Sequence, residues 1–209
     1  MKYKLVIFDF DGTLADSYPF FLGVQNELAK KYNFRQLTEE ELKAIDGDPL
    51  EIVKRAGMPL WKLPFTMVSA RRMLSERIDQ IPLFEGVLKT MEALSKKGAM
   101  LSMITSNSYA NVAKKLGADT VSLFRNPQFK TSLFGKGARL KKLISKTRID
   151  PAKVIYIGDE VRDVKSAKSQ HVPFGAVSWG YTSLDTLRKY SPEEVFHSME
   201  EIVEIVSQE

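Results

Sequence analysis

The chain of 209 residues contains no cysteine. Disulfide bonds, thiolate zinc sites and cysteine nucleophiles are therefore excluded. The chain also lacks any run of about 18 apolar residues, the length that a membrane-spanning helix needs. Its first apolar run ends at Asp9 after only a few residues, which is too short for the apolar segment of a secretory signal. We therefore expect a cytoplasmic protein that does not span a membrane.

Charge of one sign is not concentrated in any part of the chain. The 31 basic residues exceed the 26 acidic ones by five, and the basic pairs are dispersed over stretches with a helical pattern. Such pairs are typical of solvent-exposed helix faces, and no nucleic-acid-binding motif accompanies them. We expect no nucleic-acid partner, although the positive excess favours anionic small molecules. Nothing in the sequence specifies an oligomeric state.

Strand patterns and helix patterns alternate along most of the chain. Short apolar runs bounded by turn residues predict buried strands, and helical patterns fall between most of them. The alternation predicts an α/β fold with a doubly wound, mostly parallel, Rossmann-like sheet. The predicted strands are 5–8, 100–104, 154–157 and 174–179, with 121–124 as a weaker candidate.

The stretch 17–82 interrupts this alternation, because it is helical in pattern nearly throughout and offers no strand. Pro19 opens one helix, and Thr38 with Glu41 forms a capping box for a second. Two further helices are predicted before Pro82. The sequence therefore predicts a core domain formed by residues 1–16 and 83–209, and an inserted α-helical bundle, the cap, formed by residues 17–82.

Polar residues follow each of the first three main predicted strands. In an open parallel sheet, ligands bind at the carboxyl ends of the strands, near the point where the strand order reverses. We therefore expect these side chains to converge at one edge of the sheet. They are Asp9 and Asp11 after the first strand, Thr105, Ser106 and Asn107 after the second, Asp159, Glu160 and Asp163 after the third, and Lys136 at a predicted helix start.

The charge of such a cluster indicates its chemistry. Carboxylates a few ångströms apart repel one another, and without compensation one of them takes up a proton. A hard divalent cation such as Mg²⁺ relieves this repulsion and leaves coordination positions for phosphate oxygens. With Mg²⁺ and Lys136 to offset the charge of a phosphoryl group, Asp9 would attack phosphorus and form an aspartyl-phosphate. This role requires the Asp9 carboxylate to lie bare beside the cation.

Two residues next to Asp9 fit the same reaction. Asp11 would protonate the leaving oxygen in the first step and then activate water in the second. Gly12 lets the backbone approach a ligand closely. The sequence therefore predicts a metal-assisted phosphoryl-transfer site directly after the first strand.

Four motifs occur in order along the chain. They are DFDGTLADS at 9–17, SMITSN at 102–107, GKGARL at 135–140 and YIGDEVRD at 156–163. Together they resemble the haloacid dehalogenase-like (HAD) hydrolases, specifically the phosphoglycolate-phosphatase-like branch, whose helical cap lies between the first and second motifs. The resemblance covers nearly the whole chain and implies a HAD-like α/β core.

The resemblance also implies roles for the motif residues. Asp9 would be the nucleophile, Asp11 the general acid and base, and Thr105 a ligand of the transferring phosphoryl group. In that family Mg²⁺ is held by the Asp9 carboxylate, the Asp11 main-chain carbonyl and Asp159. Asp163 lies on or near the ion, and whether Glu160 or Asp163 is a direct ligand stays open. The implied metal residues are thus Asp9, Asp11, Asp159 and Asp163.

The third motif departs from its best-known form, in which the lysine precedes proline. Gly137 follows Lys136 here, and Lys130 and Lys141 are competing lysines. We favour Lys136 as the catalytic lysine because it stands beside glycine at a predicted helix start.

Substrate contacts are expected from both parts of the chain. In the cap, Asp46-Gly47-Asp48-Pro49 resembles the loop that meets substrate in the family, and arginines nearby offer contacts to an anionic group. Arg71 and Arg72 are further arginines of this kind, although each is typical of an exposed surface. The predicted substrate contacts are Gly12, Ser106 and Asn107 in the core and Gly47 and Arg55 in the cap.

The expected function is a Mg²⁺-dependent phosphatase that hydrolyses a small phosphorylated metabolite, such as phosphoglycolate, through an aspartyl-phosphate. One alternative is a phosphomutase of the same fold, similar to β-phosphoglucomutase, which would yield an isomerised product and not free phosphate. The other is a non-catalytic switch that accepts a phosphoryl group and holds it. Asp11 disfavours the switch because it would promote hydrolysis.

Overall fold

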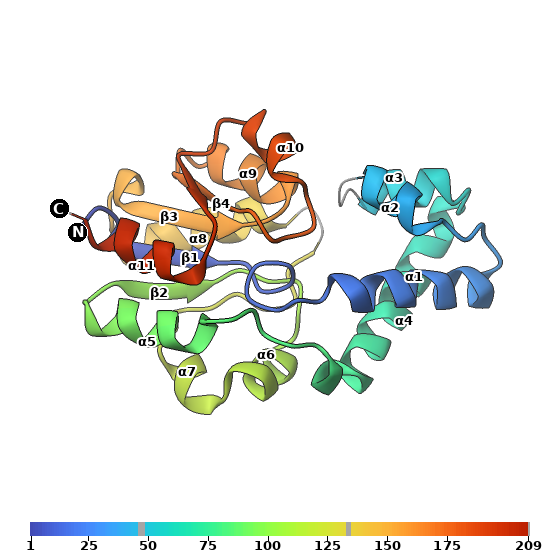
Figure 1. The fold of residues 1–209 in the computed structure, drawn as a ribbon, viewed down its shortest axis with the longest axis horizontal. Coiled ribbons are helices and arrows are strands. Elements are labelled where there is room, and N and C mark those ends of the chain that lie inside the picture. The colour runs from blue at the N-terminus through green and yellow to red at the C-terminus, as the bar shows by residue number, and fades with distance from the viewer. Residues whose placement is uncertain (46–48, 133–134, 209) are drawn as a thin grey trace.

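A single parallel sheet lies at the centre of the core in the computed structural model, which describes residues 1–45, 49–132 and 135–208 (Figure 1). The strand order is β2-β1-β3-β4-β5, and every neighbouring pair is parallel. This confirms the predicted Rossmann-like α/β sheet. The strands are β1 (Leu5–Phe8), β2 (Met100–Met103), β3 (Val154–Gly158), β4 (Phe174–Val177) and β5 (Glu194–Phe196).

Strand β1 is hydrophobic throughout because both of its faces are covered. It lies between β2 and β3, where Leu5 pairs with Met100 on one side and with Val154 on the other. Successive side chains of a strand point to opposite faces. Val6 and Phe8 accordingly enter one hydrophobic cluster, whereas Leu5 and Ile7 enter another. A continuous apolar run is typical of a strand in this position.

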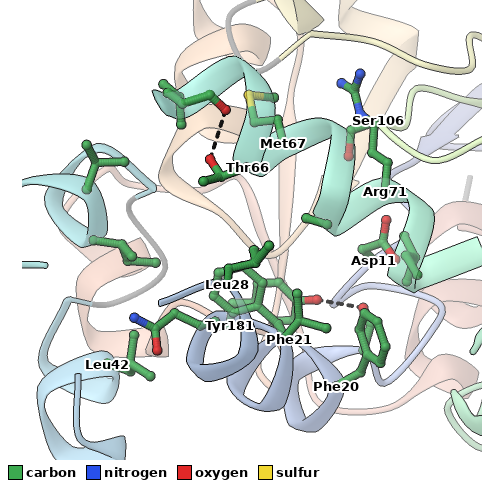
Figure 2. Close-up of a pocket in the computed structure, with 18 of the residues that line it drawn as sticks. Asp11, Phe20, Phe21, Leu28, Leu42, Thr66, Met67, Arg71, Ser106 and Tyr181 are labelled. Atoms are coloured by element: carbon green, nitrogen blue, oxygen red, sulfur yellow. Dashed lines mark hydrogen bonds between the residues drawn. The ribbon is translucent and has the colours of Figure 1, made fainter. Parts of the chain in front are cut away.

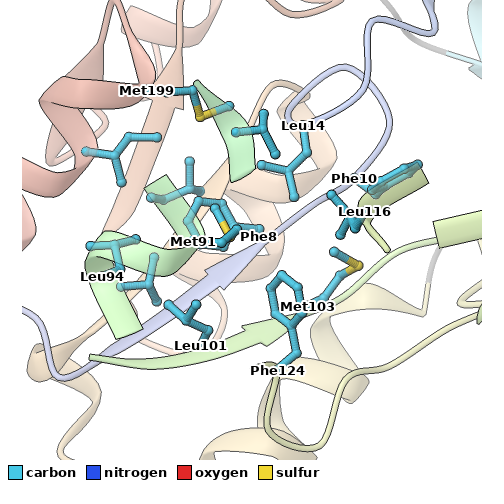
Figure 3. Packing of buried hydrophobic residues seen from close by; sticks show 14 of the residues in the cluster. Phe8, Phe10, Leu14, Met91, Leu94, Leu101, Met103, Leu116, Phe124 and Met199 are labelled. Carbon is cyan, nitrogen blue, oxygen red and sulfur yellow. The ribbon is translucent and has the colours of Figure 1, made fainter. Parts of the chain in front are cut away.

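Helices cover the two faces of the sheet separately. On one face, Met91 and Leu94 of α5 and Met199 of α11 pack with Phe8 (Figure 3). On the other face, Leu140 of α8 belongs to the second cluster. The first face is covered by α5 (Val87–Lys96), α6 (Tyr109–Leu116), α7 (Ala118–Ser122) and α11 (Met199–Ser207), and the second by α8 (Lys136–Thr147), α9 (Val161–Lys168) and α10 (Leu184–Arg188). A short 3₁₀ helix, η3 (Pro151–Lys153), precedes β3.

The segment between β1 and α5 forms a helical insert beside the core (Figure 1). Its longest helices, α1 and α4, pack against each other. The predicted capping box is present at the start of α2, where the Glu41 N–H donates to Thr38 Oγ1 at 3.1 Å and the Thr38 N–H donates to Glu41 Oε2 at 2.9 Å. The elements are α1 (Tyr18–Tyr32), α2 (Glu39–Ile45), α3 (Pro49–Arg55), η1 (Leu60–Lys62), α4 (Leu63–Glu76) and η2 (Ile78–Gln80).

The two chain segments that join insert and core lie side by side. The Asp16 N–H donates to the Pro82 carbonyl at 2.9 Å, and the Phe84 N–H donates to the Leu14 carbonyl at 3.0 Å. Within the described ranges, no helix combines the length and the apolar character that crossing a membrane requires.

Two parts of the sheet differ from the sequence-based prediction. Residues 121–124 are not a strand, because α7 occupies the first two of them and Phe124 makes only an isolated bridge to Leu101. Strand β5 was not predicted, since it has only three residues and two of them are half-buried. Its backbone is held in strand geometry by pairing with β4, which its own short sequence does not predict.

Close packing of β4 against β5 yields a stability prediction. A Cβ atom at Gly175 of β4 would lie 2.4 Å from Phe196 Cε2 and 3.1 Å from Ile155 Cδ1, and both of these side chains are fully buried. Gly175→Ala should lower the free energy of unfolding in urea by about 1–3 kcal/mol, because the core must shift to admit the methyl group. Gly23→Ala, on the exposed side of α1 with open space around it, is the matched control. It should raise the free energy by about 0.5–1 kcal/mol, and equal stability of the two variants would contradict the packing argument.

Candidate active site

Three buried carboxyl groups meet at the carboxyl end of the sheet. Asp9 follows β1 and Asp159 follows β3, and these two strands are neighbours on either side of the point where the strand order reverses. Ligand sites of open α/β sheets lie at this point. One carboxylate oxygen from each of Asp9, Asp159 and Asp163 lies within 4.8 Å of the others, and all three residues are buried. The predicted convergence of these aspartates is therefore observed.

Lys136 is the first residue of α8, and its buried ammonium group joins two of these aspartates. Its Nζ forms ion pairs with Asp9 Oδ2 and, at 2.6 Å, with Asp163 Oδ1. The other Asp9 oxygen accepts a hydrogen bond from the Phe10 N–H at 2.7 Å. Contrary to the expectation from the sequence, Asp9 is therefore not bare, because a buried carboxylate needs a compensating charge. Its partner is Lys136, the predicted lysine of the same site, so the ion pair keeps Asp9 within the site. Of the three candidate lysines, only Lys136 is buried, whereas Lys130 and Lys141 are exposed.

The carboxylate of Asp159 sits in a close-fitting socket. Thr13 Oγ1 donates to Asp159 Oδ1 at 2.7 Å, and the Tyr181 N–H donates to Asp159 Oδ2 at 2.9 Å. Two glycines close the socket, since a Cβ at Gly12 would lie 2.2 Å from Asp159 Oδ2 and one at Gly180 would lie 2.0 Å from Asp159 Cβ. Gly12 also has a φ of +76°, which L side chains rarely adopt. Gly12 therefore shapes the socket of Asp159.

Asp11 is held by an amide from the loop after β2. Asn107 Nδ2 donates to both carboxylate oxygens of Asp11 at 3.2 Å. The Asn107 N–H donates to Thr105 Oγ1 at 2.9 Å, so the residues predicted from the first and second motifs are linked. Asn107 Oδ1 accepts from Asn111 Nδ2 at 2.8 Å, and Asn111 Nδ2 donates to Ser75 Oγ of α4 at 3.1 Å. A chain of hydrogen bonds thus runs from Asp11 to the insert.

The site holds more carboxyl groups than cations. Asp9, Asp11, Asp159, Glu160 and Asp163 stand against Lys136 and Arg162, the only cationic side chains paired with them in the part of the chain that the structure describes. Burial raises the pKa of Asp159 well above its usual range, and the charges of Glu160 and Asp9 raise it further. Burial and the charge of Asp9 raise the pKa of Asp11 to about 6. Burial raises the pKa of Glu160 to about 7, although Arg162 and Lys136 oppose the rise.

Burial by itself lowers the pKa of Lys136. The charges of Asp163 and Asp9 outweigh this effect and raise its pKa above the usual value, so the ammonium group keeps its proton. The remaining negative excess makes the cluster a suitable site for a hard cation. Its ligand atoms would be carboxylate oxygens, the ligands that Mg²⁺ prefers in proteins.

A cavity of about 260 Å³ begins at this site and extends into the insert (Figure 2). Asp11, Ser106 and Arg71 of α4 lie towards one end of it, and Leu42 of α2 lies towards the other. Arg55 is not among its described lining residues, because its guanidinium pairs with Glu51 on α3 at 3.0 Å. Gly47 lies outside the described residues. Of the arginines of the insert considered from the sequence, Arg71 lines the cavity together with Asp11 and Ser106.

A family comparison gives the chain its place among known proteins. The model of the haloacid dehalogenase-like hydrolase family matches residues 6–177. The chain belongs to this family. This confirms the resemblance that the four motifs indicated.

Individual relatives of this hydrolase agree with that assignment. A phosphoglycolate phosphatase of Synechococcus elongatus is 29% identical over 207 residues, which cover 98% of each chain. An N-acetylmuramic acid 6-phosphate phosphatase of Pseudomonas aeruginosa is 25% identical over 191 residues, which make up 87% of this chain and 84% of that protein. The solved structure of a haloacid dehalogenase-like hydrolase from Streptococcus pneumoniae superposes with a TM-score of 0.81 at 20% identity over 98% of each chain, which shows a shared fold.

In addition to Thr13 and Asn111, three side chains of the hydrolase's site were not among the predicted residues. Tyr156 on β3 donates to Asp163 Oδ1 at 3.0 Å, Arg162 pairs with Glu160, and the Tyr181 hydroxyl hydrogen bonds with Ser17 Oγ at 2.6 Å. Tyr181 follows the predicted fourth strand, so the rule that placed Asp9 at a strand end could have found it. Tyr156 and Arg162 lie inside the fourth motif. Tyr156 belongs to an apolar strand and Arg162 to a helix, so the sequence does not show that their polar groups point into the site.

The socket of Asp159 predicts a selective effect of substitution at Gly12. Gly12→Ala should displace the Asp159 carboxylate, since the added methyl group would overlap Oδ2 and the backbone φ is positive. The rise in Tm that excess MgCl₂ produces should shrink by more than half in the variant, as measured by scanning calorimetry. Gly57→Ala also has a positive φ, +62°, but nothing lies within 4 Å of its Cβ. This control should keep the full MgCl₂ effect, and an equal loss in both variants would contradict the socket.

The raised pKa values predict how stability depends on pH when no divalent cation is present. The carboxyl pKa values of Asp11 and Glu160, about 6 and about 7, exceed those of an unfolded chain, which are about 4. The folded protein then binds more protons between about pH 4 and pH 7, so its stability falls as the pH rises through this window. In EDTA, we expect a higher Tm at about pH 5.5 than at about pH 8.

Two further samples test whether this pH dependence comes from the site. Excess MgCl₂ should reduce the difference in Tm between the two pH values, because a bound cation stabilises the ionised carboxylates. Glu160→Gln should also reduce it in EDTA, because the variant lacks one of the shifted groups. A Tm that rises between the two pH values in EDTA would oppose the assignment.

Proposed function

We propose that this hydrolase is a Mg²⁺-dependent phosphatase that cleaves the phosphate monoester of a small metabolite through an aspartyl-phosphate intermediate. The observation that carries the proposal is the buried carboxylate of Asp9, which pairs with Lys136 beside Asp159 at the switch point of the sheet. The relatives named as phosphatases support the same reaction class. The cytoplasmic location expected from the sequence stays a prediction.

The donor set fits Mg²⁺. Asp9 and Asp159 present clustered carboxylate oxygens, and the site has more carboxyl groups than cations. The carboxylate of Asp163 accepts three hydrogen bonds, from Lys136, Tyr156 and the Glu160 N–H, whereas the carboxylates of Asp9 and Asp159 each accept two. In this proposal Asp9 and Asp159 hold the ion and Asp163 positions Lys136. When bound, Mg²⁺ neutralises phosphoryl oxygens and makes phosphorus a better electrophile. The predicted Asp11 carbonyl ligand stays part of the proposal.

In the first step, an Asp9 carboxylate oxygen attacks phosphorus and the bond between phosphorus and the ester oxygen breaks. The ammonium group of Lys136 offsets the charge of the phosphoryl oxygens as they approach Asp9. Thr105 Oγ1 accepts the Asn107 N–H, so its own hydroxyl proton points elsewhere and can be donated to a phosphoryl oxygen. Ser106 lies at the end of the cavity, where it can meet the substrate.

Asp11 acts as general acid in the first step and as general base in the second. With a pKa raised to about 6, it can donate a proton to the leaving alcohol and afterwards accept one from water. The water oxygen then attacks phosphorus, phosphate leaves, and the Asp9 carboxylate is restored. Asn107, which donates to both Asp11 oxygens, holds the carboxyl group in one orientation for these transfers.

We further propose that residues 17–82 form a cap domain that moves on the core formed by residues 1–16 and 83–209. The paired linker segments at Asp16 and Pro82 support a compact hinge, and polar contacts such as Ser75 with Asn111 join the two parts. Closure of such a cap would exclude water from the phosphoryl group. Gly47 and Arg55 would contact substrate only as part of this movement.

Substitution of the two aspartates of the first motif tests the mechanism. Asp9→Asn should lower phosphate release from p-nitrophenyl phosphate with Mg²⁺ by at least ~10³-fold, because the nucleophile is lost. Asp11→Asn should slow steady-state turnover by about 10²–10⁴-fold. This aryl ester has a good leaving group, so Asp9 should still be phosphorylated and the phosphoenzyme should accumulate, as intact-protein mass spectrometry would show.

The controls separate this reaction from its alternatives. Asp185→Asn, an exposed aspartate on α10, should leave the rate unchanged, and EDTA should abolish turnover by the wild type. An isomerised sugar phosphate in place of free phosphate would identify a mutase. A stable phosphoenzyme in the wild type would identify a switch. A wild-type protein inert towards every phosphate ester would refute the enzyme proposal.

A further inference from the structure

The cavity in the insert has an unusual lining for a pocket that begins among charged groups. Apart from its end at Asp11, it is bounded mainly by apolar side chains of α1 and α4, including Val24, Leu28, Met67 and Leu74. Protein interiors contain few voids larger than a water molecule. Its volume, about 260 Å³, approaches the lower end of the range found for small-molecule sites, roughly 300 Å³.

Gln25 of α1 is a polar exception in this lining. Its side chain is 5% exposed, and neither its amide oxygen nor its amide nitrogen has a hydrogen-bond partner in the described ranges 1–45, 49–132 and 135–208. A buried amide without partners is unfavourable, and such groups are rare in folded proteins. A ligand with a polar atom inside the cavity would supply the missing partner.

The position of Gln25 along α1 sets the length of such a ligand. Tyr18, the first residue of α1, lies beside the site, because its ring centroid is 5.3 Å from that of Tyr181, whose N–H binds Asp159. Gln25 follows Tyr18 by seven positions, which places its Cα roughly 10 Å farther along the helix axis. Helical side chains tilt back towards the N-terminus, which shortens the gap but does not close it. Glycolate has two carbons and spans only about 4 Å at about 1.5 Å per bond. It cannot reach from the phosphoryl site to Gln25.

We infer that the cavity receives the leaving group of the substrate and that Gln25 determines specificity by hydrogen bonding with its far end. The inference rests on the proposed function, in which Asp11 protonates the ester oxygen and therefore marks where the leaving group begins. Asp11 also lies where the cavity begins. The preferred substrate is thus a phosphate monoester of an alcohol with an apolar ring or chain and a polar atom at its far end.

Three primary alkyl esters test this specificity. They are 2-phosphoglycolate, 2-phenylethyl phosphate and 2-(4-hydroxyphenyl)ethyl phosphate. In all three the leaving group is a primary alcohol. The two arylethyl esters differ only in the terminal hydroxyl, whereas glycolate is shorter and carries a carboxylate. The wild type should show a kcat/KM at least about tenfold higher for the hydroxyphenyl ester than for either of the others, because a site built for a hydrogen bond discriminates against a ligand that lacks it.

Gln25→Leu isolates the hydrogen bond. The kcat/KM ratio of the hydroxyphenyl ester to the phenyl ester should fall from about tenfold to near one. The Tm of the free variant should rise, because an unpaired buried amide is removed. Gln36→Leu makes the same exchange at an exposed position of the insert and should keep the wild-type ratio. A lower Tm together with an unchanged ratio would assign Gln25 a structural role and overturn the inference.

A second variant probes the cavity without touching the amide. Ala70→Leu places extra atoms in the lining of α4 and should raise the KM of the hydroxyphenyl ester at least about fivefold more than the KM of phosphoglycolate. An equal effect on both esters, or a wild-type preference for phosphoglycolate, would overturn the inference and leave the phosphatase proposal intact. Failure of the wild type to hydrolyse any of the three esters, or p-nitrophenyl phosphate, would instead refute the proposed function.

Discussion

The ion pairs of Lys136 with Asp9 and Asp163 are the interaction on which the rest of the site depends. These carboxylates are buried, and a buried charge is tolerated only when an opposite charge and hydrogen bonds compensate it. Lys136 lies 127 residues from Asp9 in sequence, so α8 must begin at one particular place relative to the end of β1. Tyr156 and the Glu160 N–H hold Asp163 from the other side, which ties β3 and the start of α9 to the same point.

Topology explains why the carboxyl groups meet at this point of the sheet. Strands β1 and β3 are neighbours although β2 lies between them in sequence, so Asp9 and Asp159 end up at one switch point. Glycines then let the neighbouring loops approach Asp159 closely, since a Cβ atom at Gly12 or Gly180 would overlap its side chain. The insert joins this arrangement through Asn107, Asn111 and Ser75, which link the proposed proton donor Asp11 to α4.

Much of the fold could be predicted because its signals are local. The limits of β1, the capping box at Thr38 and Glu41, and the start of the helix at Lys136 each follow from a few adjacent residues. Strand β5 could not be predicted, because three half-apolar residues acquire strand geometry only by pairing with β4. The segment 121–124 is mostly apolar, yet its first two residues are helical, because Val121 of α7 and Phe124 just after it pack on the core in this geometry.

The sequence by itself determined which residues we propose for the chemistry, because motifs at a strand end or a helix start mark Asp9, Asp11, Lys136 and Asp159. Only the tertiary structure decided how they are paired. Lys136 forms ion pairs with Asp9 and Asp163, and Asn107 donates hydrogen bonds to Asp11. It also decided that an apolar cavity with the unpaired amide of Gln25 lies behind Asp11. Pairing and cavities depend on distances between segments far apart in sequence, and no local pattern of residues encodes such distances.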